Sequence, residues 1–505
     1  MNRETHISPS RRGTVLWGLL VLVAVLWTAR EVPDFDFVAW DDELNILVNP
    51  NLGPPTPHNL AWMFTDFSYM RRYVPFGWLG FSVAYAFSGL SPLAYHIGNL
   101  LLHTANALLL YLLIAWALRR WHSDPDEHRI APSAAAGALL WAIHPLRAET
   151  VGWASGMLYT QACFFALLSV LVYCRAQSPG RRGGNPSDAG PITVRRGAGS
   201  KEPGALSAHA WYWTAVLLYA VSMLTYPITI GLLAVFVVID VVEWRRRNRV
   251  GALRFEGGAA CPPAADVGAN ASERVKDNSL HRSFQQHERS RAAWLEAGPL
   301  VVEKIPFLAA AFAVSTVTVF SRVTAGSFWP QAPDLAELSL IDRLVRAFYT
   351  VAYYLWKTCW PVNLSPLPPQ LSEVKSYWAA AVLSTIGICV TTYFLWRARQ
   401  RRPGALLLWL CYLILLVPML GFAEKSFYIA DRYSYLPTMT VSVALSAALV
   451  SLSRQVYRMS AIVVVAGLVT FVVMTSVQLR VWPDSTTLFA RCVELAGNPT
   501  LRDDA

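Results

Sequence analysis

Charged residues are scarce in this 505-residue chain. Asp, Glu, Lys and Arg make up 15% of it, and 54% of the residues are hydrophobic. Soluble domains carry roughly 25% charged residues. The mean hydropathy is +0.35. This balance excludes an ordinary soluble domain and predicts an all-α polytopic membrane protein, with Trp and Tyr supplying the aromatic belts found at membrane interfaces.

Lysine is rare as well, although the net charge is +10. Only six of the 43 basic residues are lysines. In a soluble protein such a positive balance would suggest nucleic acid. Here the arginines cluster at the ends of apolar runs, which is the positive-inside pattern of cytoplasmic loops. The arginine bias also indicates a GC-rich bacterial genome, so we expect a multi-pass protein of the bacterial inner membrane.

Several familiar motifs are missing from the sequence. The seven cysteines form no CxxC or Cys/His pattern, so no zinc or iron site is predicted. GxGxxG, Walker, GxSxG and HExxH motifs are absent, which disfavours soluble nucleotide or hydrolase chemistry. No inverted repeat is visible, which disfavours a standard secondary transporter. No small-residue cleavage site follows the first apolar run, so we expect an uncleaved first span.

About eleven apolar runs approach the roughly 20 residues that a spanning helix needs. They cover residues 13–29, 93–118, 132–145, 157–174, 210–225, 227–243, 301–320, 376–396, 405–421, 437–452 and 460–478. If the N-terminus is cytoplasmic and residues 338–360 do not cross the membrane, all the arginine clusters face the cytoplasm. Because Arg343 and Arg346 lie there on a helical aromatic face, we expect an interfacial or re-entrant helix on the outer side.

The spans divide the chain into predicted regions. We expect a cytoplasmic N-terminus at 1–12, a transmembrane domain at 13–479 with a long helical first outer loop at 30–92, and an outer C-terminal segment at 480–505. Two cytoplasmic stretches, 175–209 and 244–300, are polar or rich in Gly, Pro and Ser. They cannot bury enough apolar surface to offset the entropy lost on ordering, so flexible loops are expected.

The first outer loop concentrates acids beside the membrane. In "FDFVAWDDELNILVNPNL" (35–52), Asp41 and Asp42 come shortly after the first span and next to Trp40. Acidic side chains beside a bilayer are energetically costly unless they are solvated, paired with a cation or have a functional role. Desolvation would raise the pKa of such a carboxyl, and a raised pKa suits a general base acting on a hydroxyl. A helix cap or a solvated loop acid is the alternative explanation.

Two further outer strings combine arginine with acids. "HPLRAETVGW" contains His144, Arg147 and Glu149, and "IADRYSYLP" contains Asp431, Arg432 and Tyr433. The arginine side chain binds phosphate as a two-pronged fork. Each string could equally hold an Arg–carboxylate pair with a purely structural role. "KTCWPVNLSP" adds Lys357 and a Trp-Pro turn on the same side.

One predicted span carries a polar stripe. "YHIGNLLLHTANALLLY" (95–111) places His96, Asn99, His103 and Asn106 three to four residues apart, so they share one helical face. Such a stripe within a span usually packs against a neighbouring helix through hydrogen bonds. We favour that interpretation over the lining of a polar path.

Seven strings, spread in order from residue 39 to residue 500, together resemble a known family. They are "AWDDELNILVNPNL", "GLSPLAYHIGNLLLHTANALLLY", "HPLRAETVGW", "EKIPF", "KTCWPVNLSP", "IADRYSYLP" and "VWPDSTTLFARCVELAGNPT". The family is that of the multi-spanning GT-C glycosyltransferases whose C-terminus carries tetratricopeptide repeats, relatives of the O-mannosyltransferases. The last string resembles the lead-in to such a repeat array.

The resemblance implies a glycosyltransferase that takes a sugar from a polyprenyl or dolichyl phosphate. It implies transfer to a hydroxyl of a protein or glycan on the non-cytoplasmic face. An acid of the first outer loop is the base in that class, which here is Asp41 or Asp42, with Asp41 slightly favoured. The donor phosphate would bind to outer-loop arginines, and other outer residues would shape the site. The expected phosphate ligands are Arg147, Arg432 and Arg72, and the expected shaping residues are His144, Glu149, Asp431, Tyr433 and Lys357. No tightly bound cofactor is expected, and a divalent metal at the two acids is a weaker alternative.

The sequence also departs from the family pattern. A charged run usually follows "HPLRAETVGW", but here the chain reads "ASGMLYTQA" (154–162). Tyr226 stands where a lysine usually precedes the proline, and Val74 stands where an arginine does. A catalytically lapsed relative, acting as a membrane scaffold or glycan-binding protein, is therefore the alternative. A transporter or flippase for a lipid-linked glycan ranks last, because few polar residues lie deep in the spans.

Overall fold

The computed structural model describes residues 9–121, 126–177, 207–257, 301–324, 339–365, 374–420 and 429–497. Within these ranges every regular element is a helix and no strand occurs. Seven of the described helical segments are long and apolar enough to cross a membrane, and two shorter apolar helices accompany them. The chain is an all-α polytopic membrane protein, as its composition predicts.

Each of the eleven predicted spans coincides with a helix. The helices are α1 (Pro9–Thr28), α4 (Leu93–Trp121), α5 (Glu127–Ala142), α7 (Met157–Ala176), α8 (Ala208–Thr225), α9 (Leu232–Gly257), α11 (Ile305–Thr324), α13 (Val374–Arg397), α14 (Pro403–Leu416), α15 (Met439–Ser451) and α16 (Arg454–Leu479). Most of their ends differ from the prediction by about six residues or fewer, but α9 continues 14 residues beyond the predicted 243. For example, α5 begins ahead of the predicted 132 because the Asp126 side chain caps it by accepting from the backbone N–H of His128, 3.1 Å away.

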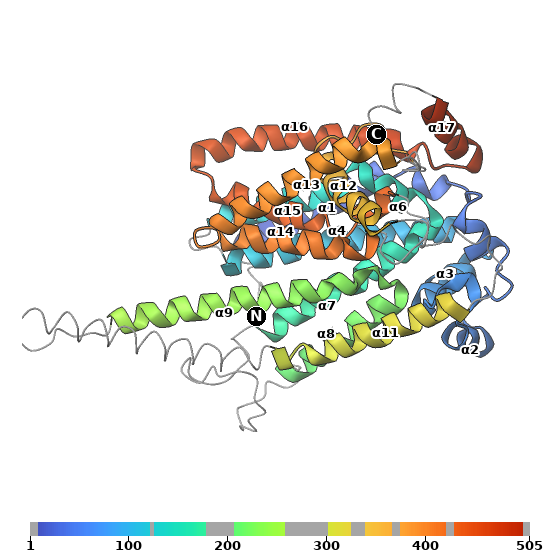
Figure 1. Ribbon diagram of the computed structural model, residues 1–505, viewed down its shortest axis with the longest axis horizontal. Helices are drawn as coiled ribbons and strands as arrows, with labels where there is room; N and C mark the ends of the chain where they lie inside the picture. The colour runs from blue at the N-terminus through green and yellow to red at the C-terminus, as the bar shows by residue number, and fades with distance from the viewer. Residues whose placement is uncertain are drawn as a thin grey trace, which may run out of the picture.

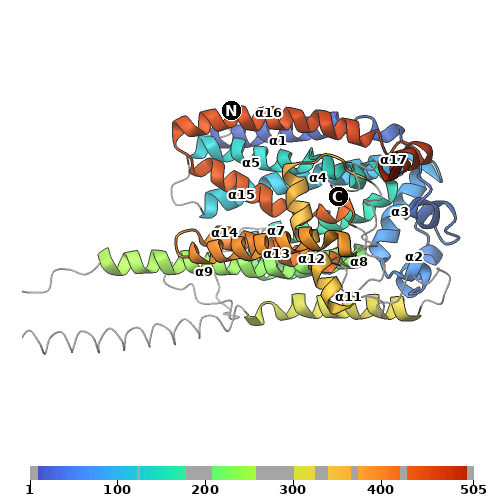
Figure 2. The same cartoon turned by 45° about the horizontal axis from the view of Figure 1, so that its top comes forward.

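The long helices lie side by side, and several short helices gather at one end of the bundle (Figures 1 and 2). These short helices are α2 (Pro57–Thr65), α3 (Pro75–Ser88), α6 (Ala148–Gly152) and α17 (Ser485–Gly497). The first outer loop, which runs from the end of α1 to α4, lies at the same end. Residues far apart in the sequence therefore meet there, and this is the end that carries the candidate site.

The polar stripe of α4 is buried and bonded to its neighbours. Asn99 donates from Nδ2 to the carbonyl of Thr150 at 2.8 Å, and Asn106 donates to the carbonyl of Thr160 at 2.8 Å. His103 lies between the carbonyl of Ala142 and the hydroxyl of Tyr435. All these polar atoms serve helix packing, so the packing interpretation of the stripe is confirmed.

The segment expected not to cross, 338–360, forms α12 (Leu340–Cys359). It is not among the described helices that are long and apolar enough to span. Val351 accepts at its carbonyl from the Tyr412 hydroxyl of α14, and Tyr354 donates from its hydroxyl to the carbonyl of Ala430. The C-terminal end of α12 thus lies against the outer string 429–437, while its interfacial position stays a prediction.

The expected cytoplasmic loops are described only at their edges. Helix α7 ends at Ala176, α8 begins at Ala208, and α9 continues to Gly257, so the first part of the second expected loop is helical. Residues 178–206 and 258–300 lie outside the described residues. The expected division of the chain into regions stays a prediction.

Candidate active site

The first outer loop is anchored by its apolar residues. Phe35, Phe37 and Val38 are buried in one cluster with Trp78 of α3 and Trp153. The acids between and after them cannot follow into this cluster without partners, because burying an unpaired charge is costly. The loop therefore holds its acidic residues in fixed positions at the end of the bundle where the short helices gather.

Asp42 is the most deeply buried acid of this loop, with 0% of its surface exposed. Its Oδ1 accepts hydrogen bonds from the backbone N–H of Ser155 at 2.8 Å and from the Ser155 hydroxyl at 2.5 Å. Its Oδ2 accepts from the backbone N–H of Val38 at 3.1 Å. Burial raises the pKa of Asp42 to about 7, although these hydrogen bonds oppose the rise.

Asp41, next in the chain, is placed differently. Its Oδ2 accepts from Nη2 of Arg72 at 3.1 Å, and the two side chains are 23% and 27% exposed. Burial lowers the pKa of Arg72, but Asp41 and the nearby Tyr226 and Tyr159 outweigh this effect and raise it overall. Asp41 therefore forms part of a charged pair that reaches solvent.

A second Arg–carboxylate pair joins two other predicted strings. Arg432 donates from its backbone N–H to Oε2 of Glu149 at 2.8 Å, and its guanidinium pairs with Oε1 of the same carboxylate. The guanidinium also lies over the ring of Trp153, 5.4 Å from its centre. Burial lowers the pKa of Arg432, but Glu149, Tyr433 and Tyr159 together outweigh this effect and raise that pKa well above the usual value.

Two tyrosines lie between these pairs. Nε of Arg432 donates to the hydroxyl of Tyr159 at 3.2 Å, and that hydroxyl lies 3.4 Å from the hydroxyl of Tyr226. Arg72 is close enough to both hydroxyls to interact with them electrostatically. The structure thus brings Asp41, Arg72, Arg432 and Glu149 into one site, with two phenols that sequence reasoning did not select.

The sequence held only a faint signal for these phenols. Tyr159 lies near the start of the apolar helix α7. In the sequence it looks like a core residue or like one of the tyrosines of a membrane-interface aromatic belt. Tyr226 precedes Pro227, and a residue before proline is held in extended backbone. Its φ of −162° and ψ of 123° show that conformation. A tyrosine with restricted backbone at the end of a span could be expected to hold its hydroxyl in a fixed place. Its hydrogen-bond partner, Tyr159, could not be predicted from the spacing in the sequence.

Arg147 is not at the surface of this site. It is 1% exposed. Its Nη2 donates to the Ser434 hydroxyl at 2.5 Å, and its guanidinium lies over the rings of Trp141 and Tyr435. Its Nε and Nη1 have no hydrogen-bond partner among the described residues. Burial lowers the pKa of Arg147 to about 10. The contact of Arg147 with phosphate stays a prediction, and the burial of its side chain weighs against a direct contact.

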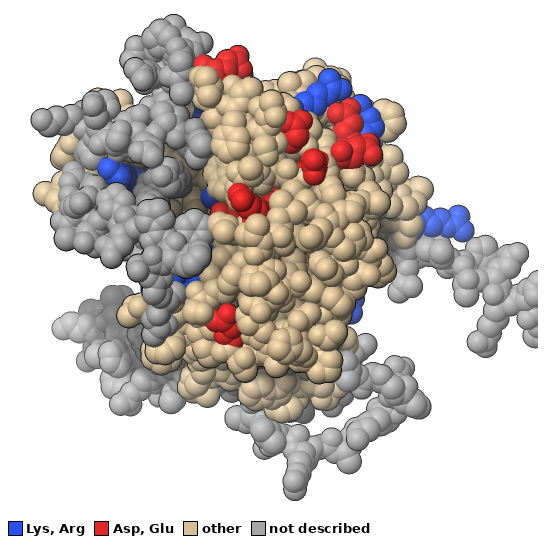
Figure 3. All heavy atoms as spheres, turned by 90° about the vertical axis from the view of Figure 1, so that its right-hand side faces the viewer, with Lys and Arg blue, Asp and Glu red and all other residues tan. Residues whose placement is uncertain are grey.

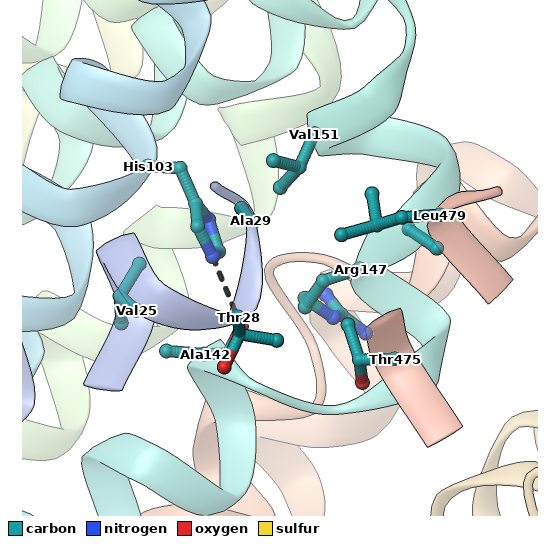
Figure 4. A pocket seen from close by; sticks show the side chains of 10 residues that line it. Val25, Thr28, Ala29, His103, Ala142, Arg147, Val151, Thr475 and Leu479 are labelled. Atoms are coloured by element: carbon teal, nitrogen blue, oxygen red, sulfur yellow. Dashed lines mark hydrogen bonds between the residues drawn. The ribbon is translucent and has the colours of Figure 1, made fainter. Parts of the chain in front are cut away.

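A small cavity lies beside Arg147 (Figure 4). Its volume of about 10 Å³ is enough for about one water molecule. His103, Thr28 and Thr475 are among the residues that line it. The cavity is too small for a sugar or a phosphate.

Of the predicted shaping residues, Asp431 and Tyr433 flank Arg432 in the chain, whereas His144 and Lys357 make their hydrogen bonds to α12 and to the loop after it. His144 contacts the Thr358 carbonyl of α12 through Nε2 at 3.0 Å, while Lys357 donates to the Val362 carbonyl at 2.7 Å. Tyr433 lies beside the Arg432 guanidinium, 5.0 Å from ring centre to Cζ. Asp431 is buried, and burial together with Glu149 raises its pKa well above the usual value. These side chains connect α12 and the 429–437 string to the site.

The end of the bundle that holds the short helices carries acidic side chains at several places on an otherwise largely uncharged surface (Figure 3). Asp34, Asp36 and Glu43 of the first outer loop are exposed. No group of three or more His, Cys, Asp or Glu side chains is arranged to hold a metal ion in the part of the chain that the structure describes. In those residues, no third side chain therefore joins Asp41 and Asp42 as a possible metal ligand.

The chain is similar to several curated proteins. It is 29% identical to "Protein O-mannosyl-transferase TMTC4" of Homo sapiens over 250 residues, 47% of this chain and 31% of that protein. It is 22% identical to "Protein O-mannosyl-transferase TMTC1" of Homo sapiens over 479 residues, 90% of this chain and 48% of that protein. It is 32% identical to "Protein O-mannosyl-transferase TMTC2" of Mus musculus over 143 residues, 27% of this chain and 16% of that protein.

The chain thus spans between about a third and about half of the length of the first two human relatives. No protein-family model matches it, and no solved structure matches it. The similarity supports a relationship to the O-mannosyltransferase-like proteins, which the seven strings of the sequence indicated.

Proposed function

We propose that this chain is an integral membrane glycosyltransferase that moves a sugar from a polyprenyl or dolichyl phosphate to a hydroxyl acceptor on the non-cytoplasmic face. The observation that carries the proposal is the meeting of Asp41, Arg72 and Arg432 at one end of the bundle, in a chain similar to protein O-mannosyl-transferases. The names of these relatives support a protein acceptor.

Asp41 is the proposed general base. The pKa of Asp42, raised to about 7, would suit a base, but Asp42 is fully buried and both of its oxygens already accept hydrogen bonds. A base must first be within hydrogen-bond reach of the proton it removes. Asp41 is partly exposed, so an acceptor hydroxyl could approach it, which supports Asp41 as the base. Asp42 then acts as a positioning residue that holds the loop.

Arg72 and Arg432 are the proposed phosphate ligands. A guanidinium offers paired donors that match phosphate oxygens. Donors fixed in advance around the phosphate also stabilise the negative charge that develops on the leaving group. The lipid chain would lie along the apolar helices, several of which expose large hydrophobic side chains, among them Phe312, Val319 and Phe320 of α11.

The proposed reaction is a single displacement. Asp41 removes the proton of the acceptor hydroxyl, and the acceptor oxygen forms a bond to the anomeric carbon of the sugar. The bond from that carbon to the phosphate oxygen breaks, and its electron pair leaves with the lipid phosphate. The configuration at the anomeric carbon inverts because only one displacement occurs.

The proposed orientation has the N-terminus in the cytoplasm and the site on the opposite face. It follows the arginine clusters, such as 245–249 and 397–402. The bacterial origin expected from arginine usage rests on composition alone, and the relatives are eukaryotic.

Sugar transfer by the purified protein in lipid vesicles tests the proposal. Radiolabelled polyprenyl-phosphate sugars and a hydroxyl-bearing peptide are supplied to the wild type, Asp41→Asn, Asp42→Asn and, as a matched control, Asp34→Asn, an exposed acid of the same loop. We expect transfer by the wild type and the control, no transfer by Asp41→Asn, and reduced transfer by Asp42→Asn.

Two results would contradict this account. Full transfer by Asp41→Asn would remove Asp41 from the role of base. If the wild type transferred no sugar from any donor, the lapsed-relative alternative would be favoured. A specific observation supports that alternative, namely that both site arginines are already paired with carboxylates.

A further inference from the structure

The hydroxyl of Tyr226 ends a chain of hydrogen bonds that starts at the largely buried Arg432. Nε of Arg432 can only donate, and it donates to the Tyr159 oxygen at 3.2 Å. The Tyr159 proton is then directed to the Tyr226 oxygen, 3.4 Å away. The Tyr226 oxygen accepts, so its own O–H is left as a donor, and no acceptor for it lies among the residues that the structure describes.

Two guanidiniums, each paired with a carboxylate, lie near this O–H. Arg72 interacts electrostatically with the hydroxyls of both tyrosines, and Arg432 contacts Tyr159 directly. Each guanidinium is paired with one carboxylate, Asp41 or Glu149, so neither contributes a full unpaired charge. A neutral O–H donor between two partly compensated cations suits an oxyanion, because it adds a hydrogen bond without adding further charge.

The position of Tyr226 is fixed by its backbone and its ring. Pro227 follows it and restricts it to extended backbone. Its ring lies 4.8 Å from the ring of Tyr159, centre to centre, at an interplanar angle of 56°. Tyr159 is buried, whereas Tyr226 is only partly so. Tyr226 is therefore held with its hydroxyl at the accessible end of the chain of hydrogen bonds.

We propose that Tyr226 is a further donor-binding residue, whose O–H donates to an oxygen of the lipid phosphate held between Arg72 and Arg432. Tyr159 acts as a positioning residue, because it orients the Tyr226 hydroxyl from the Arg432 side. This inference rests on the proposed function and identifies a ligand contact that neither arginine can make. It predicts an effect on binding of the phosphate rather than on the proton transfer at Asp41.

The test uses Tyr226→Phe, which keeps the ring against Tyr159 and removes only the hydroxyl. The full chain in detergent is titrated with a polyprenyl monophosphate, and the Kd is compared with the donor KM and kcat of sugar transfer. A hydrogen bond to a charged group corresponds to roughly a tenfold change in affinity or more. We expect Kd and KM to rise about tenfold, with kcat changed less than about twofold.

Two further variants separate a ligand contact from a packing role. Tyr159→Phe disconnects Tyr226 from Arg432 and should raise Kd and KM by a smaller factor, about threefold. Tyr85→Phe on α3, outside the chain of hydrogen bonds, should change neither. The melting temperature of each variant reports folding, and Tyr159→Phe carries the test if Tyr226→Phe does not fold.

The outcomes distinguish the two proposals. If the wild type binds and transfers while Tyr226→Phe has the same Kd and KM, the role of Tyr226 is overturned and the proposed function stands. If Tyr226→Phe lowers kcat alone, Tyr226 is not a phosphate ligand. If the wild type binds no polyprenyl monophosphate and transfers no sugar, both proposals are overturned.

Discussion

The carboxylate of Asp42 and the residue Ser155 lie 113 positions apart in the sequence, and two hydrogen bonds join them. One comes from the Ser155 backbone and one from its hydroxyl, and both reach Oδ1. They tie the first outer loop to the turn that follows α6. Because Asp41 precedes Asp42 directly, this tie also determines where Asp41 meets Arg72.

Ser155→Ala should destabilise the protein. It removes the hydroxyl donor from a fully buried carboxylate, and loss of a hydrogen bond to such a group costs about 1–3 kcal/mol. Thermal unfolding of the purified protein in detergent measures the change. Ser91→Ala, at an exposed position, is the control and should unfold like the wild type. An unchanged Ser155→Ala would show that the tie contributes nothing to stability.

The pH dependence of stability should carry a component from Asp42. Its pKa is raised from 3.8 to about 7, so the folded state holds the proton more tightly than the unfolded state. The resulting stability is fully present below about pH 4 and is lost as the pH rises to about 7, on the order of 4 kcal/mol. Asp42→Asn cannot titrate. Its melting temperature should therefore rise relative to that of the wild type between pH 4 and pH 8, whereas parallel curves would contradict the raised pKa.

Breaking the Arg432–Glu149 pair should be costly. Glu149→Ala leaves a largely buried guanidinium without its carboxylate, and removal of one partner from a buried pair costs about 3–5 kcal/mol. Chemical unfolding followed by tryptophan fluorescence measures this. Glu31→Ala, which disrupts the exposed pair with Arg480, is the matched control and should have no measurable effect. Similar losses for both variants would mean that burial does not distinguish the two pairs.

The helices of this fold could be predicted because each apolar run is long and unbroken. The runs 93–118 and 460–478 lie wholly within α4 and α16. Helix ends were less predictable, because caps such as Asp126 and the continuation of α9 to Gly257 depend on local contacts rather than on hydrophobicity. The segment 338–360 forms a helix, α12, that is not among the described helices apolar enough to span, and its interfacial position stays a prediction.

The site was partly predictable for a different reason. Acids and arginines outside the spans stand out against an apolar background, so Asp41, Arg72 and Arg432 could be selected from the sequence. Their pairing could not, because Arg72 reaches Asp41 across 31 residues of loop and Glu149 reaches Arg432 across 283. Asp41 and Asp42 look alike in sequence, and only burial and hydrogen bonding separate them.

Buried charges inside the bundle were harder to recognise. Nζ of Lys304 donates to the Tyr173 hydroxyl at 2.7 Å and pairs with Asp240, which connects α7, α9 and the start of α11. Each of these residues lies in or at the edge of an apolar run. From such a position in the sequence, a polar side chain is expected to reach solvent. The contact between them exists only once three helices have packed.

Ser485 should affect catalysis through the first outer loop. Its hydroxyl oxygen accepts from the backbone N–H of Ala39 at 2.7 Å, close to Asp41 in the chain. Ser485→Ala removes the hydrogen bond that holds the backbone at Ala39. We therefore expect kcat for sugar transfer to fall about threefold to tenfold. The Kd for a polyprenyl monophosphate should stay unchanged. Thr486→Ala, at the neighbouring exposed position, is the control and should leave both constants unaltered. A rise in Kd with unchanged kcat would mean that the C-terminal segment acts on the phosphate ligands and not on the loop of the proposed base.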